Sequence, residues 1–319
     1  MKKFLLIITL FAVLLLPLLS EGGYKEETFF AMDTVITLKV KGNKELLSEG
    51  KEIIEEIHKN YNAFDKNSQV SKLNETGELS EGDTKLFKRA KEFYLATAGA
   101  FDPTVKPLTD LWNITAENPA VPDEKKIKSV LGKVSGDNLV TEDKVYLKNG
   151  AQLDLGGIAK GFATDKTVEM LKNSGCKDFV LNLGGNIYAY SEKKPLTVGV
   201  QEPFSQRGEL LFTLDVSDSA VVSSGTYERF FEENGKRYHH IFDPNTGYPA
   251  ETGISQVTVV GKDCTMCDAF STAILVGGEK LALILKEKYD FEYIILSGKN
   301  LITSNEIEIC NVKEGYVLK

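Results

Sequence analysis

Cysteine and histidine are scarce in this chain of 319 residues, which contains four cysteines and three histidines. No cysteine precedes Cys176, so the N-terminal region offers no thiol for lipid attachment. Four cysteines are too few for a disulfide scaffold in a chain of this length. Cys264 and Cys267 form a lone CxxC, and we interpret them as small, semi-buried side chains on a helix rather than as zinc ligands.

Basic residues are in the minority: 38 Lys and Arg face 46 Asp and Glu, which gives a formal net charge of −8. Such a charge repels phosphate backbones, and no cluster of Lys and Arg alternates with aromatic residues as a strand-binding groove requires. Nucleic acid is therefore excluded as a partner. A content of 42% apolar and 26% charged residues is typical of a soluble globular protein instead.

Long apolar runs are absent except at the N-terminus, where Lys2 and Lys3 precede the run from Phe4 to Leu19. This layout is typical of an export signal. The run is shorter than the roughly 20 residues that cross a bilayer, yet no clear small-x-small cleavage site follows it. We predict a signal peptide over 1–23, with an uncleaved membrane anchor as the alternative, and an exported, extracytoplasmic domain over 24–319.

The remaining chain shows no repeat and no linker, and its pattern alternates between strand and helix periods. We predict an α+β protein: a single large unit of mixed sheets with flanking helices, built as one lobe or as two lobes that share a core. Helices are expected over 44–64, 84–97, 157–173 and 264–287, and a Pro-punctuated loop over 99–112. Strands are expected over 28–40, 143–153, 179–183, 196–200, 209–214, 254–260 and 291–296.

The first stretch with possible chemistry is LDLGGIAKGFATD at 153–165, where a strand ends in glycines and a helix begins. Glycines let the backbone approach a ligand, and a helix N-terminus attracts an anion such as a pyrophosphate. The spacing matches neither common nucleotide-binding fingerprint, so a plain strand-to-helix turn is the alternative. Lys160 favours the anion site, because a helix dipole disfavours a cation in the first turn unless an anion is also present.

The second stretch is CDAFSTAI at 267–274. Asp268 and Thr272 are four residues apart on a predicted helix, so their oxygens share one face. Magnesium prefers such hard oxygen ligands and keeps positions open for substrate phosphates. The alternative, which this fragment alone favours, is an exposed Asp with a Thr bonded to the carbonyl four residues earlier.

The third stretch is HHIFDPNTGYP at 239–249, which combines two of the histidines with a dense set of turn residues. Pro fixes φ and Gly permits a positive φ, so His240 would be held on a rigid loop. That suits a general base, although a lone histidine is more often structural. We expect His239 to pack or to face solvent, and Asp243 to cap the turn rather than to orient the imidazole.

These stretches and several others together resemble the ApbE family of FAD:protein FMN transferases, also called flavin-trafficking proteins. The resemblance extends from about Phe30 to about Leu285 and implies an ApbE or T-fold-like architecture. Its motifs follow the order of the family: AMDT at 31–34, GAFDPTVKPL at 99–108, DLGGIAKGFATD at 154–165, LNLGGNIYA at 181–189, GVQEP at 199–203, SSGTYER at 223–229, HIFDPNTGYP at 240–249 and DAFSTA at 268–273.

The resemblance implies a reaction that no single fragment shows. Family members bind FAD and, with Mg²⁺, move its FMN half onto a Thr or Ser hydroxyl of an acceptor protein, releasing AMP. Subunits of exported electron-transfer complexes and secreted flavin reductases are the acceptors that the resemblance suggests. The alternatives are an FAD pyrophosphatase that yields FMN and AMP, and a non-catalytic carrier that stores FAD outside the cytoplasm.

The resemblance also assigns roles to residues. His240 matches the catalytic histidine, which takes the proton from the acceptor hydroxyl. Asp268, Thr272 and the carbonyl of Gly157 match the metal ligands. The FAD site is matched by Met32, Ala100, Phe101, Asp102, Asp154, Lys160 and Phe242. One departure concerns Phe64, where the family commonly has a Tyr near the flavin ring.

Overall fold

The computed structural model describes residues 23–79, 81–206, 208–304 and 306–319. The predicted signal peptide or anchor therefore lies almost wholly outside the described residues. Within the described ranges, no helix is both long and apolar enough to span a membrane.

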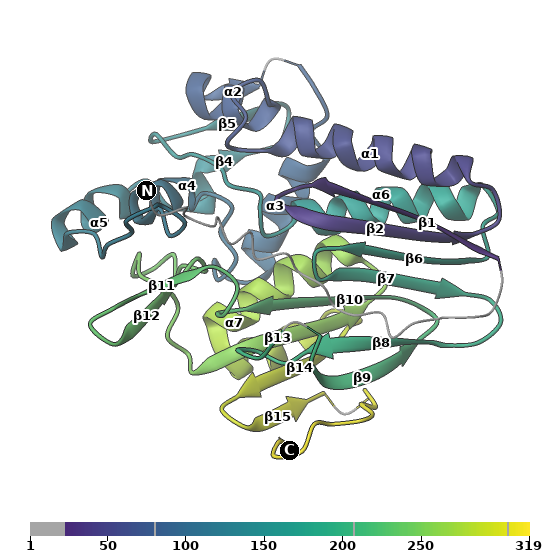
Figure 1. Cartoon of the computed structure of the whole chain (residues 1–319). Helices are drawn as coiled ribbons and strands as arrows, with labels where there is room; N and C mark the ends of the chain where they lie inside the picture. The colour runs from purple at the N-terminus through teal and green to yellow at the C-terminus, as the bar shows by residue number, and fades with distance from the viewer. Residues whose placement is uncertain (1–22, 80, 207, 305) are drawn as a thin grey trace, which may run out of the picture.

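A nine-stranded sheet forms the centre of the described part of the molecule (Figure 1). All of its neighbouring strands pair antiparallel except the last two. Its strands, in spatial order, are β1 (Tyr24–Ala31), β2 (Thr34–Lys41), β6 (Asp178–Leu183), β7 (Asn186–Ser191), β10 (Asp218–Gly225), β13 (Ile254–Gly261), β14 (Glu292–Ser297), β15 (Asn300–Thr303) and β16 (Val317–Leu318).

Helices cover one face of this sheet. The covering helices are α1 (Glu45–Tyr61), α6 (Ala159–Asn173) and α7 (Cys264–Lys286), and α3 (Lys85–Ala96) packs against α7. Side chains alternate between the two faces of a strand, so Phe179 and Leu181 pack with the helices while Val180 points to the opposite face. This helix-covered core is the largest in the described molecule.

The opposite face is covered by an antiparallel ribbon of β8 (Leu196–Gln201) and β9 (Leu210–Val216), together with segments near the C-terminus. Both faces of the central strands are therefore buried, which explains why β6 reads as a nearly continuous apolar run.

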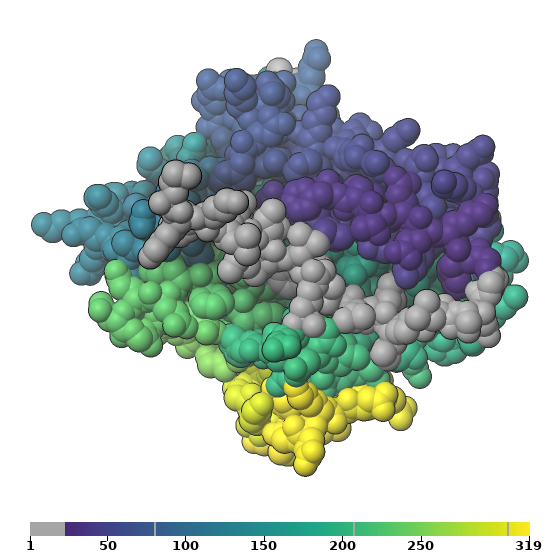
Figure 2. All heavy atoms as spheres, in the orientation of Figure 1, coloured from purple at the N-terminus to yellow at the C-terminus, as the bar shows by residue number. Residues whose placement is uncertain are grey.

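A smaller core lies at one side of the molecule, where Figure 2 shows the green hairpin next to the blue-teal helical segment. It joins α4 (Lys106–Trp112), α5 (Glu124–Leu131) and the hairpin of β11 (Phe230–Glu233) and β12 (Lys236–His239). Trp112 is 1% exposed at its centre and donates its indole N–H to the carbonyl of Gly247 at 2.9 Å. Burial of such a large ring contributes on the order of 2–3 kcal/mol and holds the loop after β12 in place.

The remaining short elements are α2 (Gln69–Thr76), a 3₁₀ turn (Gly136–Asn138) and a small sheet of β3 (Glu78–Leu79), β4 (Leu139–Val140) and β5 (Val145–Leu147). The prediction of an α+β unit with mixed sheets and flanking helices is confirmed. The helices predicted over 44–64, 84–97, 157–173 and 264–287 correspond to α1, α3, α6 and α7.

Three element predictions were wrong. The single strand expected over 28–40 is a hairpin, because Met32 and Asp33 adopt φ values of 52° and 57° and reverse the chain between β1 and β2. The strand expected over 143–153 is confined to β5, since the chain then runs irregularly toward α6. The loop expected over 99–112 contains α4, which begins with Pro107 in its first turn, where a missing N–H costs nothing.

Candidate functional site

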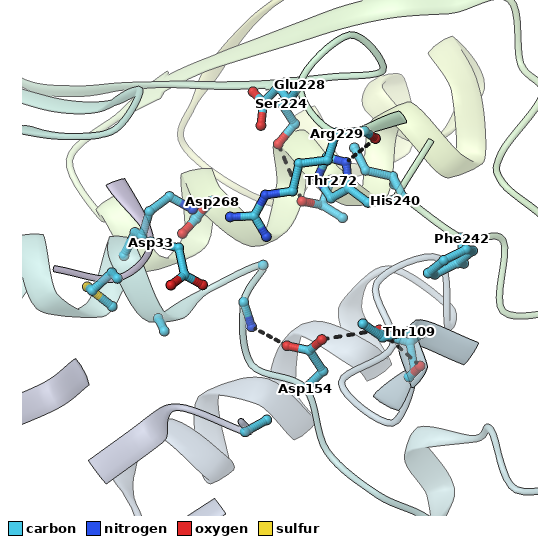
Figure 3. A pocket seen from close by; sticks show the side chains of 18 of the residues that line it. Asp33, Thr109, Asp154, Ser224, Glu228, Arg229, His240, Phe242, Asp268 and Thr272 are labelled. Atoms are coloured by element: carbon cyan, nitrogen blue, oxygen red, sulfur yellow. Dashed lines mark hydrogen bonds and ion pairs between the residues drawn. The ribbon is translucent and has the colours of Figure 1, made fainter. Parts of the chain in front are cut away.

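A cavity of about 660 Å³ is lined by residues of both the large helix-covered core and the smaller core. Every residue that the sequence assigned to the site lines this cavity: Met32, Ala100, Phe101, Asp102, Asp154, Gly157, Lys160, His240, Phe242, Asp268 and Thr272. These residues span more than 200 positions of the chain, so the fold brings the separate motifs together. Figure 3 shows Asp154 and Thr109 on one side and Ser224, Glu228, His240 and Thr272 on the other.

The N-terminus of α7 is fixed by two carboxylates. Asp263 caps the helix and accepts the N–H of Met266 at 2.9 Å. Asp165, which reaches over from α6, accepts the N–H groups of Cys264 and Thr265, each at 2.8 Å. Negative groups at a helix N-terminus are stabilising, and this double cap holds the next turn of α7 against α6.

Asp268 lies in that next turn and is only 3% exposed. Its Oδ2 accepts the backbone N–H of Gly161 at 2.9 Å, and its Oδ1 lies 3.9 Å from Nζ of Lys160. Lys160, in the first turn of α6, therefore has an anionic partner within the protein. The sequence predicted an anion beside this lysine. Burial raises the pKa of Asp268, while the charge of Lys160 and the Gly161 N–H oppose that rise.

The residues expected to hold Mg²⁺ line the same cavity. Thr272 lies one turn after Asp268 on α7, and a Cβ built on Gly157 would come within 3.6 Å of the Thr272 hydroxyl oxygen. Ser224 Oγ lies 3.4 Å from the same oxygen and 2.8 Å from the hydroxyl of Ser271. Carboxylate, hydroxyl and carbonyl oxygens are all hard donors, so this set fits magnesium.

Across the described ranges, no three His, Cys, Asp or Glu side chains cluster closely enough to hold a metal ion. The donor set expected for the metal, Asp268, Thr272 and the carbonyl of Gly157, contains one carboxylate. Magnesium retains several positions for water and substrate phosphates, so a single carboxylate with neutral oxygens suits a site completed by a phosphorylated ligand.

His240 is fixed by the backbone of Arg229. The carbonyl of Arg229 accepts the backbone N–H of His240 at 3.1 Å and lies 3.3 Å from its ring Nδ1. A carbonyl only accepts, so this contact requires the proton on Nδ1 and leaves Nε2 with a free lone pair. Burial, together with the charge of Arg229, lowers the pKa of His240 to about 3, so the ring is neutral near pH 7.

His239 packs inside the loop rather than facing solvent. Its Nδ1 accepts the N–H of Ile241 at 3.2 Å, and its Nε2 lies 3.0 Å from the carbonyl of Ala250. The ring thus ties the two sides of the loop that carries His240. Asp243 Oδ1 accepts the N–H of Asn245 at 2.9 Å, which is the turn role predicted for it.

The aspartates on the opposite side are engaged within the protein. Asp154 accepts the N–H of Gly156 at 2.9 Å and the hydroxyl of Thr109 at 3.2 Å. Asp102 accepts the N–H of Thr104 at 2.7 Å and the N–H of Gly136 at 2.9 Å. Both oxygens of Asp102 therefore already have donors, so this side chain shapes the cavity wall.

Glu228 and Arg229 line the cavity but had no role assigned from the sequence, although both lie in the SSGTYER motif. Burial raises the pKa of Glu228 to about 8, against the opposing charges of Lys160 and Arg229. Among the described residues Arg229 forms no ion pair, so its guanidinium is free to meet an anion. The SSGTYER motif matches no known spacing of catalytic or ligand-binding residues, so neither side chain could be singled out from the sequence.

Phe64 lines the cavity and is 63% exposed. Nζ of Lys106 lies 4.6 Å above the centroid of its ring, and the same ammonium pairs with Asp110. The ring is therefore placed at the cavity mouth, where a planar ligand could stack on it.

The model of the ApbE family matches residues 32–295 of this chain. The chain is similar to the "FAD:protein FMN transferase" of Klebsiella pneumoniae (strain 342), with 33% identity over 227 residues, 69% of this chain and 71% of the relative. The protein of the same name from Treponema pallidum (strain Nichols) is 37% identical over 223 residues, 63% of this chain and 62% of the relative.

Solved structures agree with these relatives. The crystal structure of the ApbE protein of Thermotoga maritima covers 91% of this chain and 97% of its own, with a TM-score of 0.79 and 32% identity. The apo form of Pseudomonas stutzeri flavinyl transferase ApbE covers 88% of this chain and 94% of its own, with a TM-score of 0.75 and 23% identity, and it supports the fold alone.

Proposed function

Because the chain belongs to the ApbE family, we propose that it is an FAD:protein FMN transferase that moves the FMN half of FAD onto a Thr or Ser hydroxyl of an acceptor protein. AMP is the other product, and the reaction depends on Mg²⁺. One observation carries the proposal: His240, Lys160, Asp268 and Thr272, from three distant motifs, line one cavity.

The cavity suits a dinucleotide. Its volume of about 660 Å³ lies within the range of small-molecule sites. Phe101, Phe242 and the exposed Phe64 supply aromatic surface for flat rings. Lys160, in the first turn of α6, places a positive charge on the cavity wall, which suits the diphosphate.

His240 is placed to accept the proton of the acceptor hydroxyl at Nε2. As that proton leaves, the hydroxyl oxygen bonds to the phosphorus of the FMN half, and the bond to the bridging oxygen breaks, so that AMP departs with that oxygen. A neutral ring is required at the start, and burial keeps it neutral. The negative diphosphate near His240 would raise its pKa again and help it to hold the proton.

Asp268, Thr272 and the carbonyl of Gly157 would hold Mg²⁺, which supplies neutralisation of phosphate charge when bound. Lys160 and Arg229 add positive charge from the protein, because both side chains line the same cavity. Phosphoryl transfer depends mostly on such positioning and charge neutralisation, so these residues bind and orient the diphosphate for attack.

Residues 1–23 support an extracytoplasmic location in this proposal, either as a cleaved signal or as a membrane anchor. The acceptor would then be an exported protein, such as an electron-transfer subunit or a flavin reductase.

The experiment incubates the full-length chain in detergent with FAD, Mg²⁺ and purified domains of exported electron-transfer subunits and flavin reductases. AMP release and flavin retained on the denatured domains are followed together. Equal amounts of AMP and bound flavin on one domain support the transferase. AMP with free FMN alone would favour the pyrophosphatase, and bound FAD without AMP would favour the carrier.

A further inference from the structure

One motif and one residue of another have no part in the chemistry above: GVQEP at 199–203, and Tyr227 of SSGTYER. Both lead into a surface group of side chains that we call the aromatic platform, in which Phe204 and Phe230 are exposed and the other two members are half-buried. It consists of Phe204, Tyr227, Phe230 and Arg237. These residues come from the loop after β8 and from the β11–β12 hairpin with the segment before it.

The platform is built by ring contacts. The rings of Phe204 and Tyr227 meet edge to face with centroids 5.7 Å apart. The guanidinium of Arg237 lies 4.5 Å from the ring centroid of Phe204 and 4.0 Å from that of Phe230. These cation–π contacts fix the positions of rings that no core covers, since Phe204 is 58% and Phe230 is 38% exposed.

The backbone holds Phe204 outward. Its φ of 64° lies in the left-handed region, which is costly for a bulky residue. The start of this loop is anchored firmly, because the buried Glu202 is bonded by Lys313 and by the hydroxyl of Tyr316. The strained backbone of Phe204 does not bury its ring, so the strain brings no stabilisation from core packing. Backbone strain of this kind is concentrated at functional sites.

The platform is continuous with the wall of the catalytic cavity. The Tyr227 ring packs over Gly225, since a Cβ there would lie 2.2 Å from Tyr227 Cε1, and Gly225 lines the cavity. Phe230 pairs in register with His239, the residue directly before His240. The platform therefore borders the cavity wall from outside, although none of its four residues lines the cavity itself.

We propose that the aromatic platform is the docking surface for the acceptor protein, and that it binds the segment next to the target hydroxyl. This inference rests on the proposed function. In the proposed function FAD fills the cavity and a protein substrate must approach His240 from outside, where the platform adjoins the wall at Gly225. Exposed aromatic and Arg side chains are also the types that dominate binding energy at protein interfaces.

The chemistry of the platform indicates what the acceptor presents to it. Arg237 already pairs with Glu232 at 2.9 Å within the hairpin, so its charge has a partner inside the protein. The surface left for a partner is therefore mainly aromatic, and it suits apolar side chains and peptide planes.

The test compares the full-length wild type with the double variant Phe204→Ala/Phe230→Ala and with Arg237→Ala. The acceptor is the purified domain that gains flavin with the wild type in the preceding experiment. For the double variant, kcat/KM for the acceptor is expected to fall at least 10-fold because KM for the acceptor rises. The variant's affinity for FAD and its release of AMP in the absence of acceptor should stay within 2-fold of the wild type.

The control is Tyr146→Ala/Lys148→Ala, which removes another pair with a cation over a ring, formed by the half-buried Tyr146 and the exposed Lys148 away from the cavity. It should leave all constants unchanged. If kcat/KM for the acceptor is equal in the wild type and both platform variants, the docking proposal is wrong, and the proposed transferase function is unaffected. If the wild type modifies none of the domains, the proposed function is wrong, and the docking proposal that rests on it is wrong as well.

Discussion

Gly161 and Asp268 join the two helices of the site: the backbone N–H of Gly161 in α6 donates to Oδ2 of Asp268 in α7 at 2.9 Å. The helices approach so closely here that a Cβ on Gly161 would lie 2.5 Å from the carbonyl oxygen of Cys264. Glycine is thus required for the backbone contact that orients the carboxylate.

Gly161→Ala should consequently destabilise the protein by about 1–3 kcal/mol, because backbone atoms of α7 must move. Urea unfolding measures this loss. Gly132→Ala is the matched control: Gly132 has a φ of −60°, and a Cβ there would meet only the carbonyl oxygen of Ser129, at 4.0 Å. Its free energy of unfolding should therefore change by about 1 kcal/mol or less. Similar losses in both variants would contradict the close helix contact.

Asp268→Asn should raise the Mg²⁺ concentration for half-maximal transfer by about 10-fold or more, because the site would lose its one carboxylate. A magnesium titration of AMP release measures this. The control Asp143→Asn alters an exposed carboxylate outside the cavity. An unchanged titration with Asp268→Asn would remove this residue from the ligand set.

Stability should fall as the pH drops below about 6.5, in part through His240. Its folded-state pKa of about 3 lies below the unfolded value of about 6.5, so the unfolded chain binds the proton first. The contribution is fully present above pH 6.5 and is lost as the pH falls toward 3. Unfolding free energies at pH 7.5 and 5 measure the loss.

His240→Gln should show a smaller loss of stability over the same interval, since it lacks the titrating ring. Histidine NMR gives an independent check: at pH 6 the His240 ring should be neutral with its proton on Nδ1. A charged ring at that pH, or a proton on Nε2, would contradict the assignment of the free lone pair.

His239→Phe should lower kcat for transfer by about 5-fold or more while the KM for FAD stays nearly constant. The two loop bonds to Ile241 and Ala250 would be lost, and each buried polar group left unpaired costs about 1–3 kcal/mol. His239→Asn keeps an acceptor near the Ile241 N–H and should recover part of kcat. Parallel losses in kcat and FAD binding in both variants would indicate general unfolding of the loop instead.

The sequence predicted the long helices well because their apolar residues repeat with helical spacing, as Ile53, Ile57 and Tyr61 do in α1, where Ile57 and Tyr61 are buried. It failed at the β1–β2 turn, where Met32 and Asp33 adopt left-handed conformations that usually call for Gly or Asn. The β10 strand and the β11–β12 hairpin were missed, since polar residues interrupt their patterns.

The site residues were found through family motifs rather than through local physics. Asp268 and Thr272 alone fitted an ordinary helix face, and only the crossing of α6 and α7 shows that Asp268 is buried beside Lys160. Arg229 and the aromatic platform were missed, because their arrangement depends on strands that pair across the fold.

The most direct test of the central claim is the intact mass of the acceptor domain after incubation with FAD, Mg²⁺ and either wild-type protein or His240→Asn. The account predicts that the acceptor gains the mass of one FMN with the wild type, matched by AMP. With His240→Asn it predicts that FAD binds to the enzyme but that the acceptor gains no mass within the same time. A full gain with His240→Asn would contradict the role of His240, and no gain with the wild type on any acceptor would contradict the transferase.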